Sequence, residues 1–161
     1  MLGLAVLGSR LYVTHGSSPN LALGWFPTDC SGGAAGIQAF APEREGLSSI
    51  VAAGTAIYWT EKASIVKCDN PPSCTGATFA GGLDSHPGAL ASDASSLYWM
   101  TAAGIFSCPL SGCVVGPKRL SCEGCPTDDY ASSSRMPSLA VDDAYVYAGC
   151  PGRGRVIRVA K

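Results

Sequence analysis

A fourfold internal repeat constrains this chain more than any other feature of its 161 residues. Each copy has a short apolar segment, a turn of small or acidic residues, and a second apolar segment that contains a tyrosine. The copies cover residues 4–14, 50–60, 90–100 and 139–149, and their tyrosines are Tyr12, Tyr58, Tyr98 and Tyr147. These tyrosines are 46, 40 and 49 residues apart. A period in the forties is typical of propellers and solenoids.

The composition of each copy favours strands over helices. β-Branched and aromatic residues dominate, and 20 glycines and 11 prolines interrupt the chain, which is typical of short strands joined by turns. This argues against HEAT and armadillo repeats, which have a similar period but are helical. A third strand and a weaker fourth strand are expected in a blade of four antiparallel strands. We expect third strands at 21–26, 64–68, 104–108 and 155–159, and fourth strands near 77–80 and 114–120.

The expected fold class is therefore all-β, with a single propeller-like domain over residues 1–161. Its blades are expected at about 1–46, 47–86, 87–136 and 137–161, three of them complete and the last incomplete. The fourth repeat stops after its third strand, so we expect a fragment or open arc of a larger propeller. Four small blades that close, or pairing with another chain, remain alternatives. Open blade faces would also favour self-association.

Two of the tyrosine segments carry a family resemblance. The sequence Tyr58-Trp59-Thr60-Glu61 resembles the YWTD signature of six-bladed propellers, and Tyr98-Trp99 keeps half of it. Residues 104–113 are similar to the cysteine-bearing propeller repeats of secreted bacterial proteins. The resemblance implies a propeller of six blades, which at this period needs about 240–270 residues, so the chain is expected to be a fragment or open arc of a six-bladed propeller. It implies no particular activity, since propellers serve many functions. We expect the aromatic pairs to pack between blades, where each ring buries a large area, rather than to form a sugar-binding platform.

Four of the eight cysteines form two pairs in equal phase with the tyrosines. Cys68 and Cys108 each lie ten residues after a tyrosine, and Cys74 and Cys113 follow them across a proline-containing turn. This spacing predicts two disulfides that staple the loop between the third and fourth strands. Disulfides form in oxidising compartments, so we expect an extracellular, periplasmic or cell-surface location.

The remaining cysteines leave several alternatives. Cys122 and Cys125 form a CxxC motif, and we expect them to join a disulfide, with Cys150 as one candidate partner. A redox-active pair lacks its usual βαβ context. A structural zinc site of Cys122, Cys125, Cys150 and His86 is a further alternative, since three cysteines and a histidine can hold zinc. Cys30 is expected on the opposite face, as an unpaired or intermolecular thiol.

Charge and motif content exclude several classes of function. Eleven basic residues balance twelve acidic ones, which argues against a nucleic-acid binder, and no apolar run is long enough for a transmembrane helix. We find no nucleophile elbow, zinc-protease motif or P-loop, and we expect no cofactor. His15, directly after a tyrosine strand, is expected in a turn. The loops that connect blades offer candidate ligand residues, namely His86, Asp84, Arg135, Arg44 and Glu45.

These observations favour a non-catalytic binding or scaffold module of a secreted or cell-surface bacterial protein, with a protein or carbohydrate as its ligand. The alternative from a different class is a propeller hydrolase or lyase with a metal in its channel, which would need several converging carboxylates, amides or histidines. A third alternative is a non-functional fragment of a longer propeller.

Overall fold

The computed structural model describes residues 3–17, 20–29, 38–121, 138–150 and 154–161. These residues form four antiparallel sheets in chain order, and each sheet is built from strands that follow one another in sequence. The first sheet contains β1 (Gly3–Leu7), β2 (Arg10–Ser17), β3 (Asn20–Pro27) and β4 (Gln38–Arg44). The second contains β5 (Ile50–Ala53), β6 (Ala56–Glu61), β7 (Ser64–Asp69) and β8 (Ala77–Ala80). The third contains β9 (Ala89–Ser92), β10 (Ser96–Thr101), β11 (Gly104–Pro109) and β12 (Lys118–Ser121), and the fourth contains β13 (Ser138–Val141), β14 (Tyr145–Cys150) and β15 (Arg155–Ala160).

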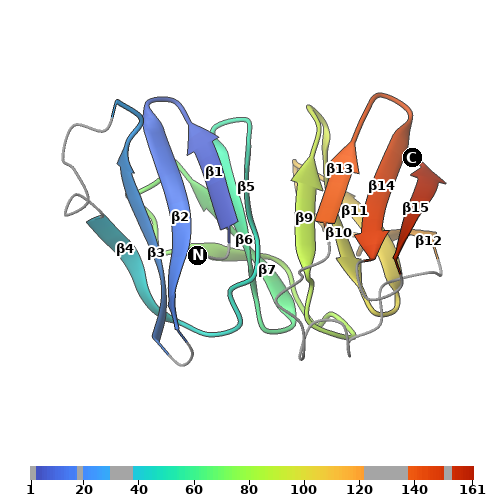
Figure 1. The fold of residues 1–161 in the computed structure, drawn as a ribbon, viewed down its shortest axis with the longest axis horizontal. Coiled ribbons are helices and arrows are strands. Elements are labelled where there is room, and N and C mark those ends of the chain that lie inside the picture. Colours follow the sequence, from blue (N-terminus) through green and yellow to red (C-terminus); the bar gives the residue numbers. More distant parts are fainter. Residues whose placement is uncertain (1–2, 18–19, 30–37, 122–137, 151–153) are drawn as a thin grey trace.

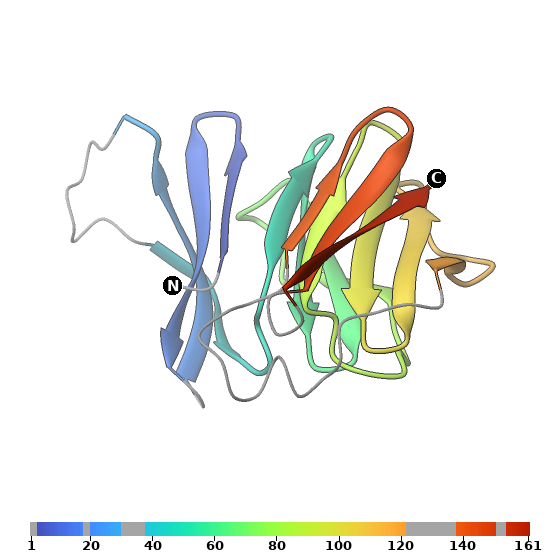
Figure 2. The same ribbon diagram turned by 45° about the vertical axis from the view of Figure 1, so that its right-hand side comes forward.

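The sheets stand beside one another in an arc (Figures 1 and 2). The first strands of the sheets, β1, β5, β9 and β13, contact one another in that order, while later strands lie progressively farther out. This is the arrangement of consecutive propeller blades, whose first strands face a common axis. The expected all-β class with three four-stranded sheets and one shorter sheet is confirmed.

The tyrosine–tryptophan pairs explain how a sheet packs against both of its neighbours. Successive side chains of a strand point to opposite faces, so Trp59 packs toward the first sheet and Tyr58 toward the third. In the next sheet, Trp99 packs back toward the second sheet and Tyr98 toward the fourth. All four rings are almost completely buried. The expectation that these aromatic pairs form the core is therefore confirmed.

Two of the turns between first and second strands begin with an aspartate, Asp93 or Asp142, whose side chain closes the turn. Asp93 Oδ1 accepts hydrogen bonds of 2.8 Å from the backbone N–H groups of Ser95 and Ser96, and its Oδ2 accepts one from the Tyr98 hydroxyl. Asp142 makes the same set of bonds with the corresponding residues of the fourth sheet, Ala144, Tyr145 and Tyr147. The aspartate thus closes the turn and positions the tyrosine of the following strand.

Two local expectations differ from the structure, and one strand had none. His15 lies within β2, paired with Ala22, and not in a turn, because β2 and β3 form a longer hairpin than the others. The fourth strand of the third sheet begins at Lys118, four residues later than expected, because Val114 and Val115 are exposed in a loop closed by the bond from Gly116 N to Cys113 O. The sequence of β4 gave no clear strand pattern. In the structure its pairing with β3 is interrupted by register shifts.

The outward face of the first sheet remains partly apolar. On β1, the side chains of Leu4 and Val6 are 51% and 58% exposed, whereas Ala5 between them is buried against the second sheet. In the described ranges no helix is both long and apolar enough to pass through a membrane.

Candidate functional site

The first linker between sheets carries an ionic network. Arg44, at the end of β4, forms an ion pair with Glu61 (3.1 Å between Nη1 and Oε1) and donates a hydrogen bond of 2.7 Å to the carbonyl oxygen of Thr75. Glu61 Oε1 also accepts a 2.7 Å hydrogen bond from the indole N–H of Trp59. One carboxylate oxygen thus joins the linker of the first sheet to the core tryptophan of the second.

His86, from the second linker, reaches the same turn from the other side. Its Nδ1 lies 2.7 Å from the carbonyl oxygen of Lys62, and its Nε2 lies 3.1 Å from Oγ of Ser48. Lys62 forms an ion pair with Glu45 at the surface. Three of the predicted residues, Arg44, Glu45 and His86, therefore gather around one β6–β7 turn.

The other two predicted ligand residues do not join this cluster. Asp84 lines a separate slot of about 140 Å³ between the second and third sheets, together with Trp99 and Phe106. Arg135 lies outside the described residues. The described candidates thus divide between two junctions, Arg44, Glu45 and His86 at the first and Asp84 at the second.

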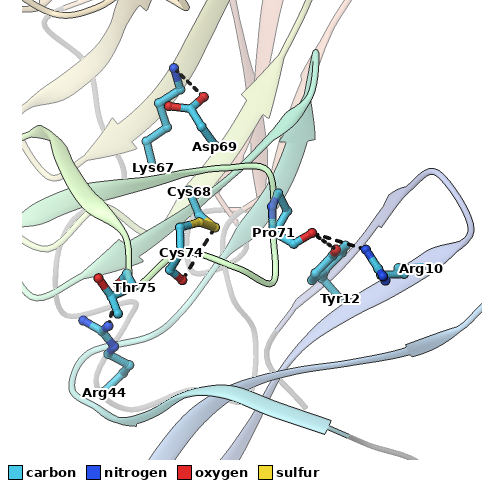
Figure 3. Close-up of a disulfide and its surroundings, with 9 residues drawn as sticks. All are labelled: Arg10, Tyr12, Arg44, Lys67, Cys68, Asp69, Pro71, Cys74 and Thr75. Atoms are coloured by element: carbon cyan, nitrogen blue, oxygen red, sulfur yellow. Dashed lines mark hydrogen bonds and ion pairs between the residues drawn. A yellow bond between two sulfur atoms is a disulfide. The ribbon is translucent and has the colours of Figure 1, made fainter.

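Both predicted cysteine pairs form disulfides, Cys68–Cys74 with Cα atoms 5.7 Å apart and Cys108–Cys113 with Cα atoms 5.3 Å apart. In each disulfide, both cysteines pack into the core between their own sheet and the preceding one. Figure 3 shows the first disulfide loop reaching toward β2 of the first sheet. These bonds are consistent with an oxidising environment outside the cytosol.

Cys150 is also disulfide-bonded, which removes it from the alternative zinc set. Its expected companions Cys122 and Cys125, and also Cys30, lie outside the described residues. Within the described ranges, no cluster of three or more histidine, cysteine, aspartate or glutamate side chains is arranged to hold a metal ion.

A larger cleft lies at the opposite end of the sheets, between the third and fourth. It has a volume of about 550 Å³, and charged and hydroxyl groups line it together with Pro109, Val115 and Gly116. Lys161 Nζ bridges the two sheets through a 2.6 Å ion pair with Asp93 Oδ2, and Lys161 N donates to the carbonyl oxygen of Ala144. The residues that give the cleft its polar character are Asp93, Asp143, Lys118, Lys161, Ser95 and Tyr98.

Electrostatics hold the central carboxylate of this cleft in its charged form. Burial by itself raises the pKa of Asp93, but the hydrogen bonds from Lys161, Ser95 and Tyr98 outweigh it and hold the pKa well below its usual value. Burial and the neighbouring carboxylate raise the pKa of Tyr98. The cleft therefore presents a fixed carboxylate beside a protonated amine and a neutral phenol.

Sequence reasoning missed this cleft. Asp93 belongs to one of the acidic turns of the repeat, and Lys161 lies 68 residues away from it. The one available signal was the pair of acids Asp93 and Asp142 in equal phase, which placed two polar turns at the same end of neighbouring sheets.

Comparison with known proteins supports the fold but assigns no family. No family model and no curated protein matches the sequence. Among solved structures, the chain is similar to a chain of a nidogen/laminin complex (TM-score 0.66, 15% identity), covering 99% of this chain and 64% of that one. It also resembles AztD of Citrobacter koseri (TM-score 0.58, 16% identity, 98% of this chain and 43% of that one) and the computationally designed protein Ika4 (TM-score 0.60, 14% identity, 99% and 89%).

This chain spans less than two thirds of the nidogen/laminin and AztD chains that it resembles. Identities below 25% carry the fold alone, so the YWTD-type assignment remains an expectation. Four antiparallel sheets in an arc, together with these propeller-like relatives, give the chain a β-propeller-like fold.

Proposed function

We propose that this chain is a non-catalytic binding module of a secreted or cell-surface protein, and that it binds a carbohydrate in the cleft between the third and fourth sheets. The observation that carries the proposal is the cleft itself, whose volume of about 550 Å³ is within the range of small-molecule sites. The two disulfides support the extracellular location.

The charge balance of the cleft favours a neutral polar ligand. Two lysines, Lys118 and Lys161, face two aspartates, Asp93 and Asp143, so a strongly charged ligand of either sign would meet repulsion as well as attraction. A polyhydroxylated ligand can donate to the carboxylates and accept from the amines and hydroxyls at the same time. Hydrogen bonds to charged groups are stronger than those between neutral groups, which favours a sugar in such a cleft.

The test uses the oxidised protein on an array of immobilised glycans, followed by calorimetric titration of the glycan that binds. The variant is Lys118→Ala with Asp143→Ala; both side chains line the cleft and are exposed. The matched control is Glu45→Ala with Lys62→Ala, which removes one acid and one base at the opposite end of the sheets. We expect at least tenfold weaker binding for the first pair and no change for the control.

Two outcomes would count against the proposal. One is an array on which no neutral glycan binds. The other is glycan binding that both double variants weaken equally, which would place the ligand elsewhere on the surface.

A further inference from the structure

The slot that contains Asp84 occupies the same place between the second and third sheets as the Arg44 network occupies between the first and second. Three positions of the network recur 40 residues later, which is the spacing of Tyr58 and Tyr98. Arg44 corresponds to Asp84, Trp59 to Trp99, and Glu61 to Thr101. The two junctions can therefore be compared group by group.

In the first junction the charges balance and the indole N–H has a partner. The guanidinium of Arg44 lies 6.0 Å from the centre of the Trp59 ring system, within the range of cation–π attraction. Glu61 pairs with the guanidinium and accepts from the indole nitrogen. The side chains of Arg44 and Glu61 are only 26% and 20% exposed, so this part of the junction is filled by the chain itself.

In the second junction an aspartate takes the place of the corresponding cation. Asp84 replaces the arginine, and its carboxylate has no ion pair or hydrogen bond with any of the described residues. Thr101 replaces the glutamate, and its hydroxyl accepts a hydrogen bond from the backbone N–H of Ala103. Trp99, which is completely buried, is left with an indole nitrogen that has no partner in the described structure.

The walls of the slot suit a flat cation. Trp99 and Phe106 stack with their centroids 6.1 Å apart and their planes inclined by 19°, and both line the slot with Asp84. A water molecule needs about 10–15 Å³ of such space, so the 140 Å³ of the slot accommodates a group of several heavy atoms. Arg119 covers Phe106 from the outer strand, 5.8 Å from the ring centre, and donates to the carbonyl oxygens of Ser121 and Ala103.

We propose that this slot binds a guanidinium group, in the position that the chain's own Arg44 takes in the neighbouring junction. Asp84 supplies the carboxylate, and the half-buried Phe106, with the buried Trp99 stacked behind it, supplies the aromatic wall. The group comes either from the arginine of a partner polypeptide or from a small guanidinium compound, since the slot recognises the same chemistry in both. The site is separate from the cleft between the third and fourth sheets, so its test does not depend on the carbohydrate proposal.

The experiment follows the indole N–H resonance of Trp99 by NMR while three probes are added to the ¹⁵N-labelled, oxidised protein. The probes are methylguanidinium, N-acetylarginine amide, and N-acetylcitrulline amide, in which a neutral urea replaces the cation. The resonance is assigned with Trp99→Phe. We expect both guanidinium probes to shift this resonance and the citrulline probe to bind at least tenfold more weakly. Methylguanidinium binding as tightly as the arginine amide would indicate a small-molecule ligand, and tighter binding of the amide would indicate a polypeptide arginine.

Variants locate the binding in the slot. Asp84→Asn removes only the exposed carboxylate and is expected to weaken both guanidinium probes at least tenfold. The double variant Asp84→Arg with Thr101→Glu copies the first junction into the second and is expected to abolish binding because the chain then fills its own slot. Arg44→Ala opens the first junction and is expected to add a second methylguanidinium site, seen at the Trp59 resonance.

The proposal is overturned if neither guanidinium probe shifts the Trp99 resonance, or if Asp84→Asn binds them as tightly as the unmodified protein. Equal binding of the arginine and citrulline probes would also overturn it, since the slot would then recognise shape without charge.

Discussion

The hydroxyl of Tyr12 donates a 3.1 Å hydrogen bond to the carbonyl oxygen of Pro71, inside the loop that the Cys68–Cys74 disulfide closes. Arg10 reaches the same oxygen at 3.4 Å, and Arg44 binds Thr75 just beyond the second cysteine (Figure 3). The first sheet thus contacts one residue inside the disulfide loop, Pro71, and one directly after it, Thr75. The bond therefore shapes the surface on which the first sheet packs, in addition to closing a loop of its own sheet.

We predict that the Tyr12 contact and this disulfide are energetically coupled. Tyr12→Phe is expected to cost about 1 kcal/mol, and Cys68→Ala with Cys74→Ala about 2–3 kcal/mol, as expected for a short loop. In the triple variant the losses are expected to fall short of their sum by at least about 0.5 kcal/mol, because the open loop no longer holds Pro71 in place. Urea unfolding followed by circular dichroism measures each free energy.

The control for this cycle is Tyr98→Phe, whose hydroxyl bonds to Asp93 rather than to a disulfide loop. Its loss is expected to add to that of the Cys68 and Cys74 changes. Strict additivity for Tyr12→Phe as well would contradict the coupling.

The two core tryptophans give a second prediction. Trp59→Phe and Trp99→Phe remove similar volumes from equally buried positions, but only Trp59 loses a hydrogen bond, the one to Glu61. Trp99→Phe instead removes a buried donor that has no partner among the described residues, which relieves a penalty. We expect Trp59→Phe to be more destabilising by about 1–2 kcal/mol in thermal or urea unfolding. An equal or larger loss for Trp99→Phe would show that the orphan nitrogen carries no cost.

We predict that the protein loses stability in acid as the Asp93 carboxylate becomes protonated. Its pKa is lowered in the folded protein, whereas an aspartate in an unfolded chain titrates near 3.9. The folded state therefore binds fewer protons, so the contribution of Asp93 is complete above about pH 4 and is lost as pH falls toward its folded pKa. Asp93→Asn is expected to lower stability at pH 7 and to flatten the dependence below about pH 4, measured by unfolding at several pH values.

Lys161→Gln serves as the intermediate case for that titration. It removes the amine that lies 2.6 Å from Asp93 but keeps the bonds from Ser95, Ser96 and Tyr98. We expect a pH dependence between those of the unmodified protein and Asp93→Asn. A steep acid dependence that persists in Asp93→Asn would assign it to other carboxylates.

The next prediction concerns close packing at Gly76, which lies beside Trp59 at the junction of the first and second sheets. It has φ of 88°, and a Cβ at this position would lie 2.6 Å from atoms of Trp59 and Val66. Gly54 also has a positive φ, 60°, but a Cβ there would meet nothing within 4 Å. Gly76→Ala is expected to cost more than 2 kcal/mol through strain and overpacking, and Gly54→Ala about 1 kcal/mol through strain alone. Equal losses in urea unfolding would show that the ring yields to the extra methyl group.

Several features of the fold were predictable because they depend on short stretches of chain. Alternation along a strand places Tyr58 and Trp59 on opposite faces wherever the sheet lies, so the core aromatic positions follow from the sequence order. Cys68 and Cys74 are six residues apart, a span that a single turn brings within bonding distance. Strand β4 and the late start of β12 were harder to predict, since register shifts interrupt the pairing of both strands and the turn from Cys113 to Gly116 precedes β12.

The candidate sites were only partly predictable, for a different physical reason. The sequence by itself determined the all-β class, the blade-like phase of the strands, the buried aromatic pairs and two disulfides, because periodicity and spacing are local properties. Only the tertiary structure decided that Lys161 meets Asp93, that Arg44 meets Glu61, and that Asp84 has no counterion within the described part of the chain. Those contacts join the ends of different sheets, and their energies depend on which groups share a junction.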